Sequence, residues 1–193
     1  MSAYETFDTP LGPFTVVVSD DGSLEAAAFG ELDGRTKLLS CALSLNVRHL
    51  IGSGEVTRDA GLTTEARRQV EEYFKGTRRH FELALAEPVT EFQRRYREEM
   101  AALGSGETIT YGELARRLGS SPRAAGRVNA TNPLCIIVPC HRVIGADGSL
   151  TGYAYGLDIK RRLLEHEGAL LQHSLPGQVA AAGKRHTSVP TGV

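Results

Sequence analysis

Apolar and polar positions over the first thirty residues form short runs separated by turn signals, a pattern typical of β-strands. Residues 14–18 (Phe-Thr-Val-Val-Val) are rich in side chains that favour strands. A Gly-Pro pair precedes this run, and residues 20–23 (Asp-Asp-Gly-Ser) follow it, with Asp-Gly as a strong hairpin signal. Residues 24–29 supply a return strand. We therefore expect β structure over residues 4–30.

Five later segments place apolar residues at the spacing of an α-helix. They are 64–75, a segment opened by Thr90 and ended by Gly104, and then 111–118, 123–130 and 158–167. Thr90 and Thr110 each begin a Thr-x-x-Gln/Glu sequence. This spacing predicts a capping box at the start of two of these helices.

Other stretches are less regular. Residues 81–85 partly alternate in polarity and predict a half-buried strand. Glu87-Pro88 ends that strand, and we place a domain boundary there. Residues 36–50 fit a helix or a strand, and the sequence leaves this choice open.

The predicted helices 111–118 and 123–130 are joined by a brief turn that contains glycine and proline. Two short helices in this arrangement fit a helix-turn-helix. Ala124 and Gly126 are small and would let the backbone approach a partner closely. An ordinary helical hairpin fits the same pattern, and on the pattern alone it is the favoured interpretation.

The most informative stretch surrounds a single cysteine. Residues 136–138 (Ile-Ile-Val) predict a buried strand or core segment, which Pro139 ends because proline lacks an N–H group. Cys140 would then lie on a rigid turn at the edge of a core. The thiolate is the nucleophilic form of cysteine, and the adjacent His141 and Arg142 are candidate cations that would lower its pKa. The alternative is an inert cysteine that only fills space, which is the commoner case for a lone cysteine beside a histidine.

Length and composition limit the class of protein. With 193 residues, 41% of them hydrophobic, the chain can form one large domain or two small ones. Cys41, Cys135 and Cys140 form no evenly spaced set, so we expect no disulfide framework. We also expect no signal peptide and no membrane span, because the basic and apolar runs that these need are missing. A reducing cytoplasm is the expected location.

The formal net charge of −1 argues neither for nor against a nucleic-acid partner. Residues 1–89 hold nine Lys/Arg and fourteen Asp/Glu, a net of −5, whereas residues 90–167 hold eleven and nine, a net of +2. The second half is therefore the better candidate surface for a polyanion, although this asymmetry is weak evidence.

One pattern of residues extends over the second half of the chain. It consists of Asn132-Pro133, Val138-Pro139-Cys140-His141-Arg142-Val143-Ile144, Gly148, Gly152-Tyr153, Gly156, Lys160, Leu163-Leu164 and Glu167. This pattern resembles the active-site half of the O6-alkylguanine-DNA alkyltransferases, also called methylated-DNA–protein-cysteine methyltransferases. The resemblance covers roughly residues 90–168, and residues 1–89 match only loosely. It implies a suicide DNA-repair protein that flips an alkylated guanine out of the duplex and moves the alkyl group irreversibly to its own cysteine.

The resemblance assigns roles to the reacting residues. Cys140 matches the alkyl acceptor, His141 the base that takes the thiol proton through a bridging water, and Glu167 the carboxylate that orients the imidazole. This is a relay of the triad type. Asn132 matches the residue that braces the turn before the cysteine. Tyr111 matches a tyrosine that crowds a phosphate during flipping and can donate a proton to the departing guanine.

Further roles concern DNA and the base pocket. Arg123 best matches an arginine that fills the space left by the flipped base, and Arg127 is its rival. The DNA-binding set is completed by small residues and the tyrosine: Ala124, Gly126 and Tyr111. The expected base pocket consists of Pro139, Val143, Tyr153, Ala154, Tyr155 and Lys160. Tyr155 stands where many relatives have a small residue, so we expect poor acceptance of bulky adducts such as O6-benzylguanine.

Four rival functions remain at this stage. A non-catalytic sensor of alkylated DNA would lack the acceptor cysteine, which is present here. The others are a Cys/His hydrolase, a metal site built from Cys135, Cys140 and His141, and a helix-turn-helix regulator. Cys41 and His49 alone do not make a zinc site, so we expect no metal and no cofactor.

The expected protein is of the α/β (α+β) class. Residues 1–88 would form a small sheet with a helix, and residues 89–170 a mostly helical domain that carries the DNA-binding helices and Cys140. Residues 171–193 would form a flexible tail. We expect a monomer whose partner is double-stranded DNA containing O6-alkylguanine, approached from the minor groove.

Overall fold

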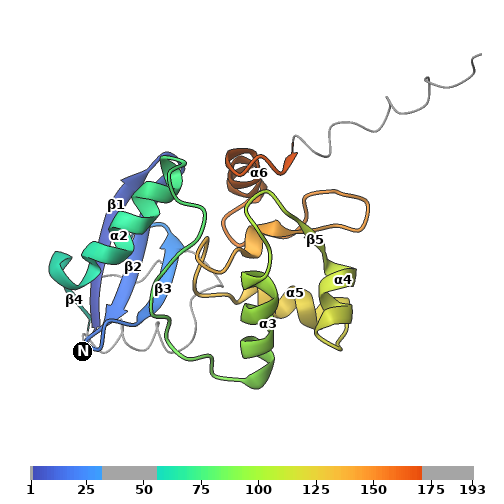
Figure 1. Cartoon of the computed structure of the whole chain (residues 1–193), viewed down its shortest axis with the longest axis horizontal. Coiled ribbons are helices and arrows are strands. Elements are labelled where there is room, and N and C mark those ends of the chain that lie inside the picture. The colour runs from blue at the N-terminus through green and yellow to red at the C-terminus, as the bar shows by residue number, and fades with distance from the viewer. Residues whose placement is uncertain (1, 32–55, 171–193) are drawn as a thin grey trace, which may run out of the picture.

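The computed structural model describes residues 2–31 and 56–170, and its first unit is a four-stranded sheet with one helix (Figure 1). The strands are β1 (Ser2–Thr9), β2 (Gly12–Ser19), β3 (Leu24–Phe29) and β4 (Val56–Arg58), in the order β3-β2-β1-β4. The first three are antiparallel neighbours, and β4 runs parallel to β1. The β structure expected over residues 4–30 is confirmed, while the open assignment of 36–50 lies outside the described residues.

Helix α2 (Ala60–Phe74) packs against β1 and β2 on one face of the sheet. It begins four residues earlier than predicted because the Asp59 side chain accepts a hydrogen bond from the Gly61 N–H and caps the helix there. It ends as predicted, with Lys75 as the C-cap and Gly76 at a φ of 75°. Its buried face consists of Thr63, Ala66, Gln69, Val70 and Tyr73.

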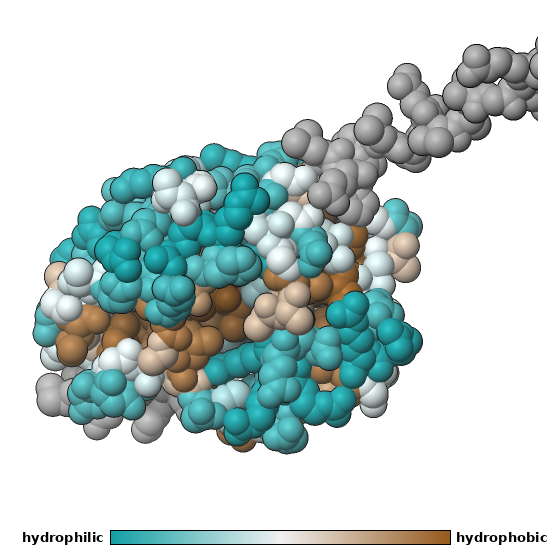
Figure 2. Space-filling model, in the orientation of Figure 1, coloured by the Kyte–Doolittle hydropathy of each residue, from teal (hydrophilic) through white to brown (hydrophobic). Residues whose placement is uncertain are grey.

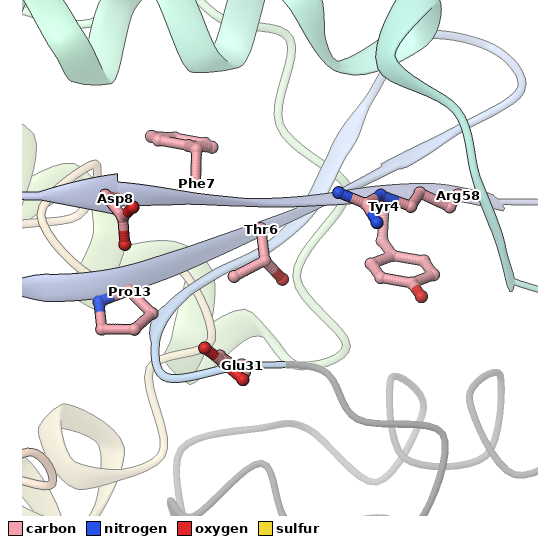
Figure 3. A pocket seen from close by; sticks show the side chains of 7 residues that line it. All are labelled: Tyr4, Thr6, Phe7, Asp8, Pro13, Glu31 and Arg58. Carbon is pink, nitrogen blue, oxygen red and sulfur yellow. The ribbon is translucent and has the colours of Figure 1, made fainter.

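The two faces of β1 have different roles. Phe7 points toward α2, whereas Tyr4, Thr6 and Asp8 point to the other side, where they line a hollow of about 330 Å³ with Pro13, Glu31 and Arg58 (Figure 3). Because side chains alternate along a strand, this hollow lies on the face of the sheet away from the helix. Its described lining holds no cysteine or histidine.

Residues 81–85 do not form the predicted strand. A single isolated bridge joins Leu85 to Leu24 of β3. The peptide groups of Glu82 pair instead with the Gln69 side chain, which accepts from the Glu82 N–H at 2.8 Å and donates to its carbonyl at 3.0 Å. A side-chain amide of α2 thus takes the place of a neighbouring strand.

The second half is mostly helical and contains α3 (Glu91–Ala101), α4 (Tyr111–Arg117), α5 (Pro122–Ala130) and α6 (Leu157–His166). The capping box at Thr90 is confirmed, with Thr90 and Gln93 bonded reciprocally. The box at Thr110 is only half formed: Thr110 accepts from the Glu113 N–H, while the Glu113 carboxylate pairs with arginines of its own helix.

Short parallel strands β5 (Ile109–Thr110) and β6 (Val143–Ile144) connect the start of α4 to the cysteine segment. Residues 136–138 do not form a strand, because they make tight turns and Ile136 has a φ of 63°. The alternative prediction of a core segment holds, since Ile136 and Val138 are buried. Cys140–Arg142 then form a short 3-10 helix, η1.

One apolar cluster extends through both halves of the chain. It includes Phe14 and Val70 from the first half and Tyr96, Leu114 and Leu134 from the second. The edge strand β3 also holds the cysteine loop directly, since Ala27 donates to the Pro133 carbonyl at 2.9 Å and accepts from the Cys135 N–H at 2.7 Å. Figure 1 shows this loop beside β3. The sheet therefore helps to position the cysteine.

The fold is α+β, as expected, while the boundary at residue 88 stays a prediction. Figure 2 shows apolar surface between the charged surfaces of α2 and α3. A groove of about 280 Å³ lies in this region, lined by Phe81, Leu83, Leu85, Arg97, Glu98, Ala101, Ile137 and Val138. No helix among the described residues is long and apolar enough to cross a bilayer.

Candidate active site

Cys140 begins η1 immediately after Pro139, and only 4% of its surface is exposed. The turn is closed by backbone bonds from the Cys140 N–H to the Val138 carbonyl at 2.7 Å and from the Arg142 N–H to the Pro139 carbonyl at 2.9 Å. The thiol therefore sits on a rigid turn at the edge of the core, as the sequence predicted.

Asn132 folds the loop that precedes this turn. Its amide donates to the carbonyls of Val138 at 2.9 Å and Leu134 at 3.3 Å, and its oxygen accepts from the Leu134 N–H at 3.2 Å. These bonds satisfy peptide groups that a strand would have paired with a neighbour, which explains why 136–138 turns instead of extending. Asn132 is thus placed where the expected bracing residue would be.

Glu167 is the centre of a buried charged cluster. Its Oε1 atom lies 2.9 Å from His141 Nε2, and Arg142 makes a bidentate pair with both carboxylate oxygens at 2.7 and 2.9 Å. The third arm of Arg142 donates to the Leu103 carbonyl at 2.7 Å. We expected Arg142 to be a second cation beside the thiol, but it forms an ion pair with the Glu167 carboxylate instead.

These contacts set the protonation of Glu167. Burial alone would raise the pKa of this carboxyl, but the charges and hydrogen bonds of His141 and Arg142 outweigh it and hold the pKa far below its usual value. The ionised carboxylate then orients His141 through Nε2. The other ring nitrogen, Nδ1, is buried and forms no hydrogen bond with the part of the chain that the structure describes.

The Cys140 thiol is activated by its neighbours. A hydrogen bond with Cys135 lowers its pKa most, burial opposes this, and His141, Asn132 and Tyr153 lower it further, to about 6. Burial raises the pKa of Cys135 well above its usual value, so Cys135 stays a neutral thiol. The result is a thiolate at neutral pH, which is the reactive form.

A narrow pocket reaches Cys140 between α5 and the loop 152–156. Its described lining is Asn129, Ala130, Asn132, Cys140, Gly152, Tyr153, Ala154 and Tyr155. The cavity volume is about 10 Å³, enough for about one water molecule. The rings of Tyr153 and Tyr155 pack edge to face with centroids 5.5 Å apart. A cavity of this size is too small for a purine.

Three residues expected in the pocket lie behind it instead. Pro139 and Val143 are buried in the cysteine turn and core. Lys160 is fully buried on α6, where its ammonium donates to the carbonyls of Val143 and Thr151, both at 2.6 Å. Desolvation lowers the pKa of Lys160 to about 8. Lys160 thus links strand β6, through Val143, to the loop beside the pocket, through Thr151.

Helices α4 and α5 form two short arms on either side of a turn. Arg123 and Arg127 on α5 are exposed, and neither guanidinium forms a salt bridge with a described residue. Ala124 and Gly126 are half-buried on the same helix. A surface with small side chains and two exposed cations that no described carboxylate pairs with is suited to a phosphate backbone.

Tyr111, at the start of α4, links this surface to the active site. Its hydroxyl donates to the Gly152 carbonyl at 3.3 Å and accepts from the Asn129 amide at 3.4 Å. The same amide donates to the Cys140 carbonyl at 3.2 Å, and the Asn129 oxygen accepts from Tyr96 at 2.8 Å. Burial raises the pKa of Tyr111, so its hydroxyl keeps its proton at neutral pH.

Three residues around the site were not predicted from the sequence. Tyr73 and Asn129 were not expected there, and Cys135 was not expected to interact with Cys140. Tyr73 and Asn129 have the helical spacing of buried residues, which signals burial but not a hydrogen-bond partner. The Tyr73 hydroxyl lies 2.9 Å from Glu167 Oε1, across 94 positions of sequence. Spacing alone carries no information on contacts at that separation.

No three His, Cys, Asp or Glu side chains in residues 2–31 and 56–170 gather as a metal site would require. The thiols of Cys135 and Cys140 form hydrogen bonds with each other and with the Tyr153 hydroxyl. Cys41 and His49 lie outside the described residues.

Comparison with known proteins agrees with this geometry. A family model described as the DNA-binding domain of 6-O-methylguanine DNA methyltransferase matches residues 91–169, and one described as the ribonuclease-like domain of the same protein matches residues 3–86. The chain belongs to the 6-O-methylguanine DNA methyltransferase family. The resemblance seen in the sequence is thereby confirmed, and it extends to the first half of the chain.

Relatives in this family are similar over most of their length. A methylated-DNA–protein-cysteine methyltransferase of Methanosarcina acetivorans is 40% identical over 168 residues, which cover 86% of this chain and 98% of the relative. The protein of the same name from Mycobacterium bovis is 37% identical over 169 residues, covering 86% and 93%. The structure of Mycobacterium tuberculosis OGT in complex with DNA is 36% identical, with a TM-score of 0.70, covering 86% of this chain and 93% of that one.

Proposed function

We propose that this methyltransferase repairs double-stranded DNA by moving an alkyl group from O6 of guanine to Cys140. The observation that carries the proposal is the position of the Cys140 thiol, on a tight turn directly before His141, whose Nε2 lies 2.9 Å from the buried Glu167 carboxylate. The surrounding groups also lower the pKa of this thiol. A sensor that only binds alkylated DNA has no use for an activated thiol. A helix-turn-helix regulator does not need one either.

The reaction is a single displacement. The Cys140 thiolate attacks the alkyl carbon, an S–C bond forms, and the bond between that carbon and O6 breaks with its electron pair on guanine. Sulfur is a soft nucleophile suited to such a carbon. The thiol proton passes through a bridging water to Nδ1 of His141, whose imidazolium is balanced by Glu167. No metal or diffusible cofactor takes part.

The departing guanine needs a proton, and Tyr111 is placed to supply it. Its hydroxyl keeps its proton at neutral pH and lies beside Gly152 at the edge of the pocket. Asn132 and Asn129 hold the peptide groups around Cys140 at fixed positions. The product thioether has no leaving group in this scheme, so each protein molecule acts once.

The DNA lies against α5, with the minor groove facing the small residues Ala124 and Gly126. The damaged base must leave the stack to reach the pocket. We assign Arg123, at the exposed start of the helix, to the space left in the duplex, with Arg127 as its rival. Tyr111 crowds the adjacent phosphate. In this proposal the chain acts as a monomer, with residues 89–170 as the DNA-binding domain.

The test is a mass measurement after mixing the protein with a duplex that carries one O6-methylguanine. We expect one added methyl group per protein and its location on Cys140. Cys135 lies on the same tryptic peptide, so fragmentation within that peptide must separate the two cysteines. Cys140→Ala should stay unmodified, and Cys135→Ser should still be methylated.

Tight binding to the damaged duplex without methylation would replace the proposal with a sensor. If the unmodified and damaged duplexes bound equally and no methyl group moved, the regulator would be the better description. A matched duplex with guanine in place of O6-methylguanine is the control for both outcomes.

A further inference from the structure

Tyr73 reaches the active site from the other half of the chain. It lies near the end of α2, the helix that covers the N-terminal sheet, and only 2% of its surface is exposed. Its hydroxyl is 2.9 Å from Glu167 Oε1. That oxygen also accepts hydrogen bonds from His141 Nε2 and Arg142 Nη2, both at 2.9 Å. Three donors from two parts of the fold thus converge on one carboxylate oxygen.

The direction of the new hydrogen bond follows from the charges. Glu167 is ionised, because its pKa is far below the usual value. Burial, and then the charge of Glu167, raises the pKa of Tyr73 well above the usual value, so the hydroxyl stays protonated. The Tyr73 O–H therefore donates to the carboxylate at every pH at which the protein would work.

The Tyr73 ring is fixed by its surroundings. Its centroid lies 5.1 Å from that of Phe74, 5.6 Å from Phe81 and 5.0 Å from His166. The Tyr73 carbonyl is itself 2.7 Å from Nε2 of His166 on α6. Because packing holds the ring on several sides, the hydroxyl cannot swing away from Oε1, and a phenylalanine would occupy the same position.

From this geometry we infer that Tyr73 is a positioning residue for the alkyl transfer, because its hydroxyl holds Glu167 Oε1 against His141. The N-terminal sheet-and-helix unit thereby fixes the position of the carboxylate that orients His141. This inference rests on the proposed function, since it concerns the same reaction. It gives the N-terminal half a direct part in the chemistry, in addition to its hold on the cysteine loop through Ala27.

The charge balance predicts what the loss of the hydroxyl would do. The proton of Tyr73 places positive charge next to Oε1, and its removal makes the potential more negative at both His141 and Cys140. A more negative potential raises the pKa of the Cys140 thiol. As the pH is lowered, the rate of transfer should therefore begin to fall at a higher pH in a variant without this hydroxyl than in the natural protein. The titratable and charged groups that face this cluster are Arg142 and His141 on η1, His166 on α6, Cys135 and Cys140.

The experiment measures single-turnover methyl transfer from O6-methylguanine in duplex DNA between pH 5 and pH 9. For Tyr73→Phe we expect the acid limb of the rate to move up by roughly half a pH unit, so that transfer near pH 5 is roughly threefold slower while the high-pH rate is retained. Val70→Ala is the matched control, because Val70 is fully buried on the same helix and its apolar side chain carries no group that could hydrogen-bond to Glu167. It should lower the melting temperature without moving the acid limb.

A second comparison asks whether Tyr73 acts through Glu167. In a Glu167→Gln background, Tyr73→Phe should produce no further shift of the acid limb. An unmoved acid limb in Tyr73→Phe, or an equal shift in Val70→Ala, would overturn the inference and leave Tyr73 as a packing residue. Absence of methyl transfer by the natural protein is a different result, which would overturn the proposed function first.

Discussion

The Sγ atom of Cys135 lies 3.0 Å from the hydroxyl of Tyr153, and the same thiol hydrogen-bonds to Cys140. The nucleophile therefore has two neutral donors beside it, each kept protonated because burial raises its pKa. A chain of this kind stabilises a thiolate without a second positive charge. The three sulfur and oxygen atoms form a unit that the order of residues along the chain does not reveal.

Loss of the Cys135 thiol should raise the pKa of Cys140 from about 6. A hydrogen bond to a charged group is worth about 1.5–3 kcal/mol, which corresponds to about one to two pKa units. In Cys135→Ala, methyl transfer near pH 5 should therefore be at least about tenfold slower, with recovery near pH 9. The pH dependence of single-turnover transfer measures this. Cys135→Ser keeps a donor and should lie between the two, whereas an alanine variant with the natural acid limb would contradict the prediction.

Glu167 should matter for stability as well as for transfer. Glu167→Ala leaves Arg142 buried without its partner, and removal of one member of a buried ion pair costs about 3–5 kcal/mol. Because the folded pKa of Glu167 is lowered, the stabilisation is complete above its ordinary pKa of 4.5 and is lost progressively as the pH falls below that value. Urea unfolding at pH 7 and pH 4 tests both statements. Glu167→Gln should show a weaker loss of stability on acidification than the natural protein, and equal losses would refute this account.

Tyr155 should restrict the size of the adduct. Its ring packs against Phe29 and Tyr153, both with centroids 5.5 Å away, over a cavity of about 10 Å³. Tyr155→Gly removes the ring and should raise the rate with O6-benzylguanine by roughly tenfold or more relative to O6-methylguanine. Competition between the two substrates gives this ratio directly. Equal ratios for the variant and the natural protein would show that another residue limits the pocket.

The two exposed arginines of α5 should differ in their effects. Arg123→Ala should slow repair of duplex DNA strongly, because a flipped base leaves a space that this side chain fills. Arg127→Ala should weaken binding of damaged and undamaged duplex equally and reduce the slope of log affinity against log salt by about 0.9, as expected for one phosphate contact. Binding titrations at several salt concentrations, with transfer rates, distinguish them. Reversal of the two phenotypes would assign the intercalating role to Arg127.

Local sequence was enough for the features that depend on neighbours in the chain. The hairpin around Asp21-Gly22, the capping box at Thr90, and the two helices on either side of the turn Gly119-Ser120-Ser121 were all predicted, because turns, caps and amphipathic faces are set by residues a few positions apart. The turn that carries Cys140 was predicted as well, although the strand that Pro139 would have ended does not form.

Tertiary structure decided the features that join distant segments. Residues 136–138 have the composition of a strand but turn, because Asn132 supplies the partners that a neighbouring strand would have given. Residues 81–85 alternate like a strand, but Gln69 of α2 satisfies their peptide groups.

The same division holds for the site. The sequence by itself determined which residue types are present in the site: a cysteine, a histidine and a carboxylate in a recognisable pattern. The pattern can be recognised because alkyl transfer to a thiol requires those residue types. Only the fold decided that Arg142 serves Glu167, that Lys160 is buried, and that Tyr73 donates to the same carboxylate. The physical reason is that a pKa depends on burial and on the charges within a few ångströms, and those neighbours come from parts of the chain that spacing along the sequence does not relate.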